Sequence, residues 1–169
     1  IPKGFNVDNC ARIRRETGML CIAVGRINTP QLAEEILEQN KADMVVMGRA
    51  QLADADFCVK AKEGRLQEIV YCIGCDQGCY DGFTDPAAPF ITCMRNPYLG
   101  KEAQDVLVPA QKPKRVLIAG GGVAGLEAAC ILKQRGHQPV VYEASDELGG
   151  QFVTAGKAPR KMEMKDAAL

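Results

Sequence analysis

The chain of 169 residues has no tryptophan, one histidine, no net charge and no long hydrophobic run. Because 21 basic residues balance 21 acidic ones, its charge gives no reason to expect binding to nucleic acid or to an anionic membrane. The longest apolar runs, such as MVVM and VLIA, are far shorter than the roughly 20 residues of a transmembrane helix. The single histidine, His137, lies in RGHQP between an expected helix and an expected strand, where no neighbour supports a catalytic role.

The two ends of the chain have no features of a natural terminus. The sequence starts with IPKGFNV, without an initiator methionine or a visible signal peptide, and ends with APRKMEMKDAAL. The length suggests one domain or two small ones. We therefore expect a piece of a longer protein, cut at both ends.

The eight cysteines are distributed unevenly. Four of them, Cys10, Cys21, Cys58 and Cys130, are scattered through apolar or helical segments, and the other four fall between positions 72 and 93. A secreted mini-protein could use eight cysteines as a disulfide framework. The uneven distribution instead favours a reducing cytoplasm and one dedicated cysteine site.

The first part of the chain alternates strands and helices. Residues 19–25 and 42–48 are apolar runs of strand length, and residues 29–40 form a helical pattern with Thr29 as the cap and Pro30 in the first turn. A second helix is expected over residues 54–64. Strands that are apolar throughout and alternate with helices predict an α/β fold with a parallel sheet covered on both faces.

A glycine-rich turn follows a third strand. The segment RVLIAGGGVAGLEAA contains Gly120-x-Gly122-x-x-Gly125 between an expected strand and an expected helix, and the next strand ends at Glu143. This context predicts a dinucleotide-binding turn, with Gly120 for the tight turn, Gly122 for approach of a pyrophosphate and Gly125 for helix packing. Glu143 could accept hydrogen bonds from both ribose hydroxyls, which favours FAD or NAD over NADP. The plain alternative is a turn that only packs a strand on a helix.

Four cysteines occupy a segment rich in Gly, Asp and Pro, for which we expect irregular structure. Their spacing, Cys72-x2-Cys75-x3-Cys79-x13-Cys93, places three ligands close together and a fourth further on. This pattern favours an iron–sulfur cluster, with structural zinc and disulfides as alternatives. Nearby glycines, such as Gly74 and Gly78, would let backbone N–H groups approach the sulfurs.

These motifs, in this order, resemble the iron–sulfur flavoenzymes of the 2,4-dienoyl-CoA reductase, enoate reductase and trimethylamine dehydrogenase group, within the old yellow enzyme (NADH:flavin oxidoreductase) superfamily. The segments that carry the resemblance are AVGRINTPQLAEEILEQNKADMVVMGRAQLADADF, CIGCDQGC, CMRNP and AGGGVAGLEAA with ELGGQF. The pair of glycines in ELGGQ resembles the one that follows the acid in FAD-binding members. The turn reads GGGVAG where the reductases commonly have GAGPAG, and its turn glycines are intact.

The resemblance implies a domain plan. Residues 1–70 would be the last two βα units of an FMN-binding TIM (β/α)8 barrel, 71–98 a 4Fe–4S segment, 99–113 a linker and 114–169 the start of a Rossmann-like FAD/NAD(P)-binding domain. A whole barrel needs about 250 residues. We therefore expect an incomplete folding unit with exposed apolar strand faces and edges, inactive alone, whose substrate-side acid and histidine lie upstream.

The resemblance also assigns residues to cofactors. The four cysteines match cluster ligands, and Arg26, Gly48 and Arg49 match FMN contacts. Taken alone, an arginine at a strand end is commonly a solvated charge; here, two of them past neighbouring barrel strands could bind a phosphate bidentately. Ala124, Glu143 and Gln151 match FAD contacts.

The implied function is electron transfer from NAD(P)H to FAD, to a 4Fe–4S cluster, to FMN and then to the C=C bond of a small enoyl or dienoyl-type substrate. Oxidation of an amine by the same group of cofactors is the alternative. Two others are a non-catalytic electron-transfer module and a zinc-stabilised structural protein. The sequence does not predict an oligomeric state.

Overall fold

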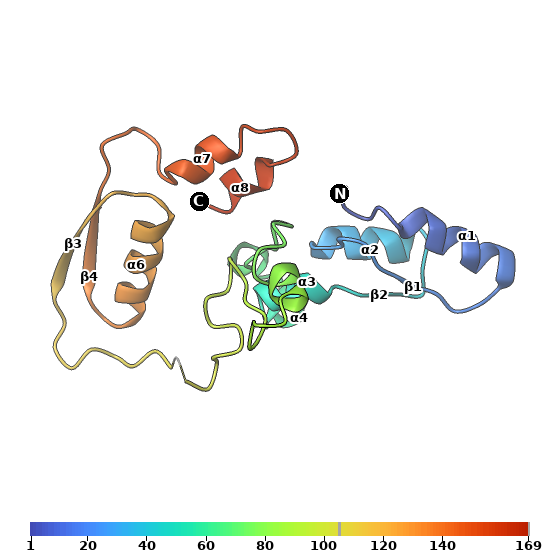
Figure 1. Ribbon diagram of the computed structural model, residues 1–169, viewed down its shortest axis with the longest axis horizontal. Coiled ribbons are helices and arrows are strands. Elements are labelled where there is room, and N and C mark those ends of the chain that lie inside the picture. The colour runs from blue at the N-terminus through green and yellow to red at the C-terminus, as the bar shows by residue number, and fades with distance from the viewer. Residues whose placement is uncertain (105, 169) are drawn as a thin grey trace. The chain divides into compact units, whose positions relative to one another are not determined.

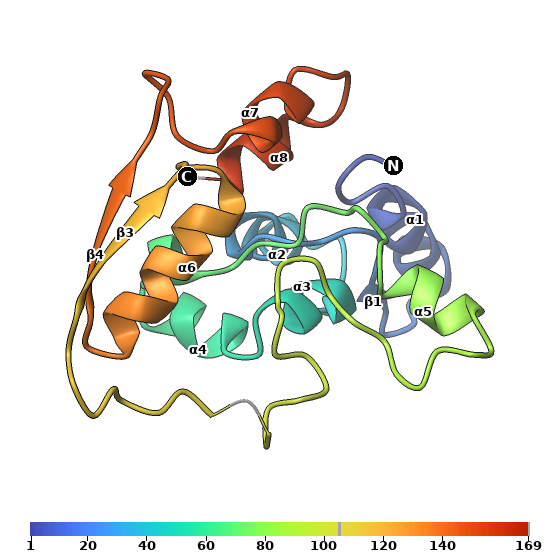
Figure 2. The same cartoon turned by 60° about the vertical axis from the view of Figure 1, so that its left-hand side comes forward.

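The computed structural model describes residues 1–104 and 106–168. Asp105, in the predicted linker, and Leu169, in the predicted Rossmann-like segment, lie outside the described residues. The chain divides into two compact units, Ile1–Lys101 and Glu102–Leu169, which are described separately (Figures 1 and 2). No helix within the described ranges is long and apolar enough to cross a membrane.

The first unit consists of short helices and two strands. Its elements in chain order are α1 (Val7–Thr17), β1 (Ile22–Ala23), α2 (Pro30–Glu38), β2 (Met44–Val45), α3 (Gly48–Ala53), α4 (Phe57–Lys62), a 3-10 turn η1 (Leu66–Glu68) and α5 (Tyr80–Thr84). Except for α5, the cysteine segment is irregular, as its composition predicted. Helix α3, which is separated from the end of β2 by two residues, was not expected from the sequence.

Local chemistry explains where the first helices begin and end. Gly18 ends α1 in the left-handed conformation, with φ at 68°, and its N–H donates to the carbonyl of Arg14. A residue with a side chain would be strained there. Thr29 precedes α2 with extended backbone, its hydroxyl accepts from the N–H of Leu32, and Pro30 occupies the first turn. The predicted cap and proline of α2 are therefore confirmed.

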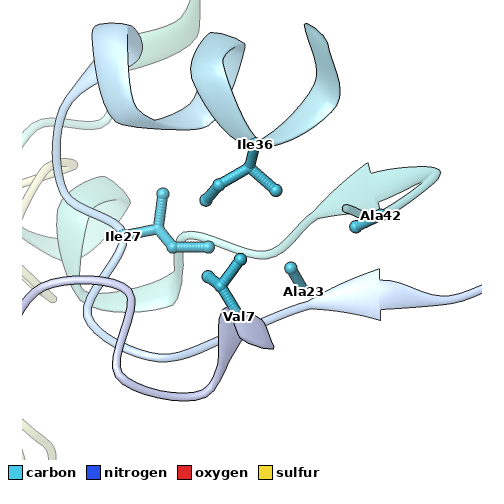
Figure 3. Packing of buried hydrophobic residues seen from close by; sticks show 5 residues of the cluster. All are labelled: Val7, Ala23, Ile27, Ile36 and Ala42. Carbon is cyan, nitrogen blue, oxygen red and sulfur yellow. The ribbon is translucent and has the colours of Figure 1, made fainter. Parts of the chain in front are cut away.

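Strands β1 and β2 pair in parallel, with Ile22 opposite Met44 and Ala23 opposite Val45. One face packs on a small core of five buried residues, Val7, Ala23, Ile27, Ile36 and Ala42 (Figure 3). The other face is not covered within this unit, since Ile22 is 53% exposed and Met44 is 61% exposed. The predicted parallel pairing is confirmed. The prediction that helices cover both faces of the sheet is wrong for this unit. The expected exposure of apolar strand faces is confirmed.

A second core packs the chain that enters the cysteine segment onto α3 and α4. Phe57, Ala50 and Ile69 are buried in it, with Tyr71 at its edge. The rings of Phe57 and Tyr71 meet edge to face, with 6.4 Å between their centroids and 87° between their planes. Such pairs stabilise beyond the area they bury. Because Tyr71 immediately precedes Cys72, this contact fixes the start of the cysteine segment.

The second unit is a βαβ arrangement followed by two short helices. Its elements are β3 (Arg115–Ala119), α6 (Val123–Gln134), β4 (Gln138–Tyr142), α7 (Gln151–Ala155) and α8 (Met162–Asp166). Strands β3 and β4 are parallel over five residue pairs, from Arg115 opposite Gln138 to Ala119 opposite Tyr142. Helix α6 lies alongside both strands in the two views (Figures 1 and 2). The predicted order of strand, turn, helix and strand is confirmed.

Candidate functional site

One pocket in the first unit brings the four clustered cysteines together. We call it the cysteine pocket, and its lining comprises Arg49, Leu52, Cys72, Ile73, Cys75, Asp76, Gln77, Cys79, Cys93 and Arg95. Each of the eight cysteines, all within the described ranges, is a free thiol. Among residues 1–104 and 106–168, no three His, Cys, Asp or Glu side chains come close enough together to hold a single metal ion. The four predicted ligands thus share one pocket without converging on one point.

Backbone geometry explains why glycines separate the cysteines. Gly78 has φ at 80°, and a Cβ there would lie 2.3 Å from the hydroxyl oxygen of Thr92. The carbonyl of Gly78 also accepts a hydrogen bond of 2.9 Å from the N–H of Thr92. This close pairing returns the chain to the pocket one residue before Cys93. Only glycine fits at position 78.

Gly74 has a similar role between Cys72 and Cys75. Its φ is 62°, and a Cβ would lie 2.6 Å from Nε of Arg26. Its N–H donates to the sulfur of Cys72, with 3.4 Å between N and Sγ. The expectation that backbone N–H groups approach the sulfurs is confirmed at this position. Such hydrogen bonds are one of the ways in which a protein adjusts the potential of an iron–sulfur cluster.

The surroundings of Cys72 and Cys79 shift the pKa values of their thiols in both directions. Burial raises the pKa of Cys72, while the N–H of Gly74 and the charge of Arg49 lower it in part. Burial also raises the pKa of Cys79, where the N–H of Tyr80 and the charge of Arg49 act downward and Asp76 acts upward. Both pKa values are raised overall, so neither thiol is activated as a nucleophile.

Both arginines predicted to bind FMN phosphate contact the cysteine segment. Arg26, just past β1, donates from one terminal nitrogen to the carbonyl of Ile73 at 3.4 Å and from the other to that of Ile1 at 2.6 Å. Arg49, in the first turn of α3, forms an ion pair with Asp76. Gly48 is the first residue of α3, and nothing lies within 4 Å of a Cβ placed there. The phosphate role of these three residues stays a prediction.

Sequence reasoning missed two polar residues that hold the cysteine segment. Asn28 is 3% exposed, and its amide nitrogen donates to the carbonyl of Cys72 at 2.6 Å. Asn96 donates from its amide to the carbonyl of Leu52 at 2.9 Å and so fixes the chain after Cys93. Both lie in segments that carry the resemblance, Asn28 in AVGRINTP and Asn96 in CMRNP, but neither was assigned a role. Their places in these segments were the only signal.

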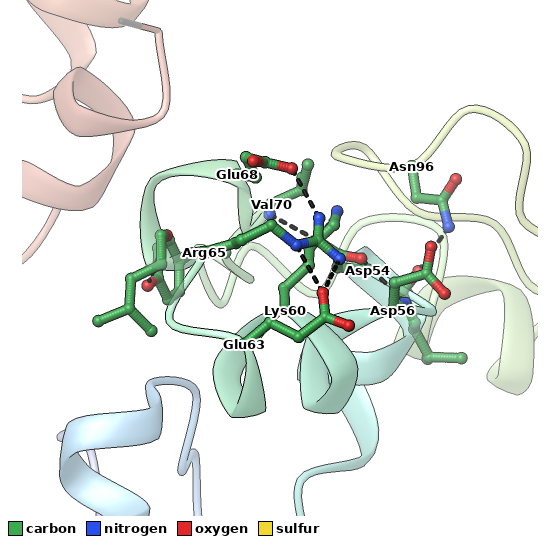
Figure 4. Close-up of polar contacts among 11 residues, drawn as sticks. Asp54, Asp56, Lys60, Glu63, Arg65, Glu68, Val70 and Asn96 are labelled. Atoms are coloured by element: carbon green, nitrogen blue, oxygen red, sulfur yellow. Dashed lines mark hydrogen bonds and ion pairs between the residues drawn. The ribbon is translucent and has the colours of Figure 1, made fainter.

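Asp54 is a third residue to which the sequence analysis assigned no role. Its buried carboxylate accepts from Lys60, from the N–H of Asp56 and from the N–H of Val70 (Figure 4). Helix α4 begins after Asp56, which makes no side-chain cap. Asp54 therefore joins α4 to the segment that enters the cysteine pocket.

The glycine turn of the second unit has the geometry that its sequence predicted. Gly120 has φ at 106°, which permits the tight turn after β3. A Cβ at Gly125 would lie 2.0 Å from the carbonyl oxygen of Gly120, so the helix can approach the turn only because position 125 is glycine. At Gly122, φ is −72° and nothing lies within 4 Å of a Cβ. The backbone there is open to a ligand.

Glu143 lies at the same end of the strands as the turn. Its carboxylate accepts from the N–H of Gly121 at 2.7 Å and from the N–H of Ser145 at 2.9 Å. These hydrogen bonds lower the pKa of Glu143 to about 2, so the carboxylate is ionised at neutral pH. Oε1 also accepts from the hydroxyl of Ser145 at 3.0 Å, and Oε2, which accepts from Gly121, keeps a further lone pair for a hydroxyl donor. The residue therefore fits the predicted ribose role.

The second glycine pair packs against the first turn. Gly149 bridges to Gly122 and donates to the carbonyl of Gly121 at 2.8 Å. A Cβ at Gly150 would lie 3.2 Å from Cα of Gly122. Gln151, next in the chain, begins α7 and is exposed, as is Ala124 in the first turn of α6. The predicted FAD contacts therefore come from adjoining backbone segments of this unit.

Two family models match the chain. Residues 4–68 match the NADH:flavin oxidoreductase / NADH oxidase family, and residues 118–162 match an NAD(P)-binding Rossmann-like domain. The chain is therefore similar to the NADH:flavin oxidoreductase family over residues 4–68. The resemblance stated from its motifs is thereby confirmed. The cysteine segment lies between the two matched ranges.

Proteins similar to this chain are much longer than it. A metal reductase of Desulforamulus reducens is 38% identical over 159 residues, which are 94% of this chain and 24% of that protein. A solved 2-naphthoyl-CoA reductase, in complex with 2-naphthoyl-CoA, superposes with a TM-score of 0.92 at 29% identity, covering 99% of this chain and 26% of that one. A solved 6-hydroxypseudooxynicotine amine oxidase from Pseudomonas geniculata N1 has a TM-score of 0.87 at 27% identity. The superposition covers 99% of this chain and 26% of that one. The chain thus spans about a quarter of the length of the relatives it matches.

Proposed function

We propose that this chain is the part of an NAD(P)H-dependent flavin oxidoreductase that holds a 4Fe–4S cluster between an FMN-binding barrel and an FAD-binding domain. The observation that carries the proposal is the cysteine pocket, whose lining includes four free thiols from one segment of the chain. Spread thiols suit a cluster, in which each sulfur binds its own iron, and the N–H of Gly74, which donates to the sulfur of Cys72, suits such a centre.

The function of the cluster would be to pass single electrons between the two flavins, since NAD(P)H and the substrate exchange electrons in pairs. The glycine turn and Glu143 would hold the FAD dinucleotide, with Ala124 and Gln151 beside it. Arg26, Gly48 and Arg49 would hold the FMN phosphate. Electrons would then run from NAD(P)H through FAD and the cluster to FMN, and two electrons and two protons would saturate the C=C bond of an enoyl or dienoyl-type substrate.

Likeness to a solved CoA-thioester reductase supports the reductive direction. Likeness to a solved amine oxidase supports the second candidate, in which the same cofactors accept electrons from an amine. The two differ in whether the substrate reoxidises or reduces the flavin. Stopped-flow measurement of the flavin absorbance of the intact protein distinguishes them. For a reductase, an enoyl-CoA should reoxidise the dithionite-reduced protein and leave the absorbance of the oxidised protein unchanged. For an amine dehydrogenase, dimethylamine should bleach the flavin absorbance of the oxidised protein.

The cofactors are tested directly by preparing the intact protein without oxygen and measuring iron, acid-labile sulfide, zinc, FMN and FAD. We expect four irons and four sulfides per chain and a brown absorbance that dithionite bleaches. Replacing Cys79 with serine should remove the iron while leaving FAD in place, because Cys79 and the glycine turn belong to different units. Zinc without sulfide would overturn the assignment and support the structural alternative.

A further inference from the structure

Asp76 lies inside the cysteine run, between Cys75 and Cys79, and its carboxylate pairs with the guanidinium of Arg49. Of the ten described residues that line the cysteine pocket, Arg49 and Arg95 carry positive charge and Asp76 alone carries a carboxylate. The three charges therefore border the same pocket as the four cysteines. Nothing in the motif itself demands an acid at this position.

The backbone holds Asp76 firmly in this place. Its φ is 62°, in the left-handed region that aspartate and asparagine tolerate better than most residues. Its carbonyl accepts from the N–H of Tyr80 at 3.1 Å and from that of Asp81 at 3.3 Å, at the start of α5. The carboxylate of Asp76 therefore belongs to a fixed loop, and it forms an ion pair with Arg49 at the start of α3.

The fields of the two residues reach the ligand sulfurs with opposite signs. The positive charge of Arg49 and the negative charge of Asp76 both border the pocket that Cys72 and Cys79 line. A positive charge near a redox centre favours the state with one more electron, and a negative charge opposes it. A carboxylate paired with Arg49 therefore cancels much of what Arg49 contributes.

We propose that Asp76 tunes the reduction potential of the centre held by the four cysteines, by pairing with Arg49 and keeping that potential lower than Arg49 alone would set it. This inference rests on the proposed function, because it requires a redox centre in the cysteine pocket. Asp76 acts through Arg49 and through space, and it contacts no reacting atom. It is a positioning and charge-compensating residue.

The size of the effect is limited by water. The side chain of Arg49 is 36% exposed and that of Asp76 is 46% exposed, so solvent and salt screen the pair in part. We expect Asp76→Asn to shift the one-electron reduction equilibrium toward the reduced state by up to about tenfold, which corresponds to about 59 mV. Asparagine keeps the size of the side chain and tolerates the same backbone conformation.

The test is a redox titration of the intact, cluster-loaded protein, followed by electron paramagnetic resonance of the reduced cluster. Asp76→Asn should raise the potential, Arg49→Gln should lower it, and the double variant should lie between them. The matched control is Asp81→Asn, which removes the same charge from an exposed residue of α5 that does not line the cysteine pocket. The shift of the Asp81→Asn potential from the wild-type value should be a small fraction of the Asp76→Asn shift.

Iron and sulfide analysis of each variant separates this inference from the proposed function. If the wild-type protein holds no iron and sulfide, the proposed function fails and this inference fails with it. If all variants hold a full cluster and Asp76→Asn shifts the potential no more than Asp81→Asn, the inference alone is overturned. Loss of iron from Asp76→Asn, with the potential of the remaining cluster unchanged, would show a purely structural role and would also overturn it.

Discussion

The carboxylate of Asp54 accepts a hydrogen bond from the backbone N–H of Val70, with 2.8 Å between Oδ2 and N. The same oxygen accepts from Nζ of Lys60 at 2.7 Å. Asp54 is 5% exposed, and although burial acts to raise its pKa, the hydrogen bonds from Lys60 and Val70 make the pKa lower than usual. A buried charge therefore fixes the chain two residues before Cys72.

Replacing Asp54 with asparagine should destabilise this region. The substitution leaves Lys60, whose side chain is only 17% exposed, without its counter-charge. We expect the free energy of unfolding to fall by about 3 kcal/mol, because breaking a buried ion pair from one side leaves the other charge uncompensated. Urea unfolding of the intact protein, followed by cluster absorbance, measures the loss.

Glu63→Gln is the control for Asp54→Asn. Glu63 pairs with Arg65 at a position where its side chain is 53% exposed (Figure 4). An exposed pair of this kind contributes at most about 1 kcal/mol. Equal losses from the two substitutions would contradict the structural role assigned to Asp54.

Replacing Gly78 with alanine should prevent the cysteine segment from closing. Alanine would be strained at φ of 80°, and its Cβ would lie 2.3 Å from Oγ1 of Thr92 and 2.9 Å from the carbonyl oxygen of that residue. Because Thr92 precedes Cys93, we expect the fourth ligand to be displaced and iron to be lost. Iron and sulfide content per chain is the measurement.

Gly64→Ala provides the matched control for Gly78→Ala. Gly64 has a similar φ of 73°, but nothing lies within 4 Å of a Cβ there. The substitution costs only the left-handed strain, about 1–2 kcal/mol, and should leave the iron content near the wild-type value. If both variants lost iron equally, backbone strain alone would explain the effect and the contact with Thr92 would be irrelevant.

The glycine turn offers two substitutions with different expected outcomes. Gly122→Ala meets no atom within 4 Å and adopts an ordinary φ of −72°, so the unit should fold normally. If a pyrophosphate approaches this backbone, however, the methyl group should reduce FAD retention at least tenfold. Flavin content and the melting temperature of the same preparation measure the two effects separately.

Gly125→Ala should show the opposite balance. Its Cβ would lie 2.0 Å from the carbonyl oxygen of Gly120, so the helix and the turn must separate. We expect a lower melting temperature as well as loss of FAD. A Gly122→Ala protein that retained FAD fully would argue that the turn only packs a strand on a helix.

Motifs whose chemistry is local were read well from the sequence. The cap Thr29 follows from the hydrogen bonding of a single residue, and the glycine turn follows from contacts within a few positions. The gathering of Cys72 and Cys93 in one pocket was also expected, because ligands to one centre must lie close together. In each case the reason lies in the residues of the motif themselves.

Features that depend on distant partners were not predictable. The pairing of Arg49 with Asp76 joins residues 27 apart, and the contact of Asn28 with Cys72 joins residues 44 apart. No periodicity or spacing encodes such contacts. The prediction that both sheet faces are covered was wrong for this unit for a related reason. The apolar pattern of residues 19–25 indicates that something packs on both faces of the strand, but it does not indicate which segment does so.

Acid should weaken the contact between α1 and β2 in a narrow range of pH. Arg14 donates twice to Asp43, at 2.9 Å to each oxygen, and the N–H of Cys21 donates to Oδ2 at 2.8 Å. These hydrogen bonds lower the pKa of Asp43 from 3.8 to about 2. Because the folded pKa is the lower one, the stabilisation is complete above about pH 4 and is lost as the pH falls toward about 2.

The variant Asp43→Asn isolates this dependence. Its deficit in unfolding free energy relative to the wild type should be constant between about pH 7 and pH 5 and should shrink below about pH 4, where the wild-type carboxylate begins to be protonated in the unfolded state. Effects of acid on the cofactors cancel, because both proteins carry the same ones.

Glu16→Gln, which removes the exposed partner of Arg12, should lower the free energy of unfolding little at any pH, since the side chains of Arg12 and Glu16 are 71% and 55% exposed. A deficit of Asp43→Asn that instead grew as the pH fell would mean that the carboxylate is stabilised in the unfolded chain, and the bidentate contact with Arg14 would not be what holds α1 against the strands.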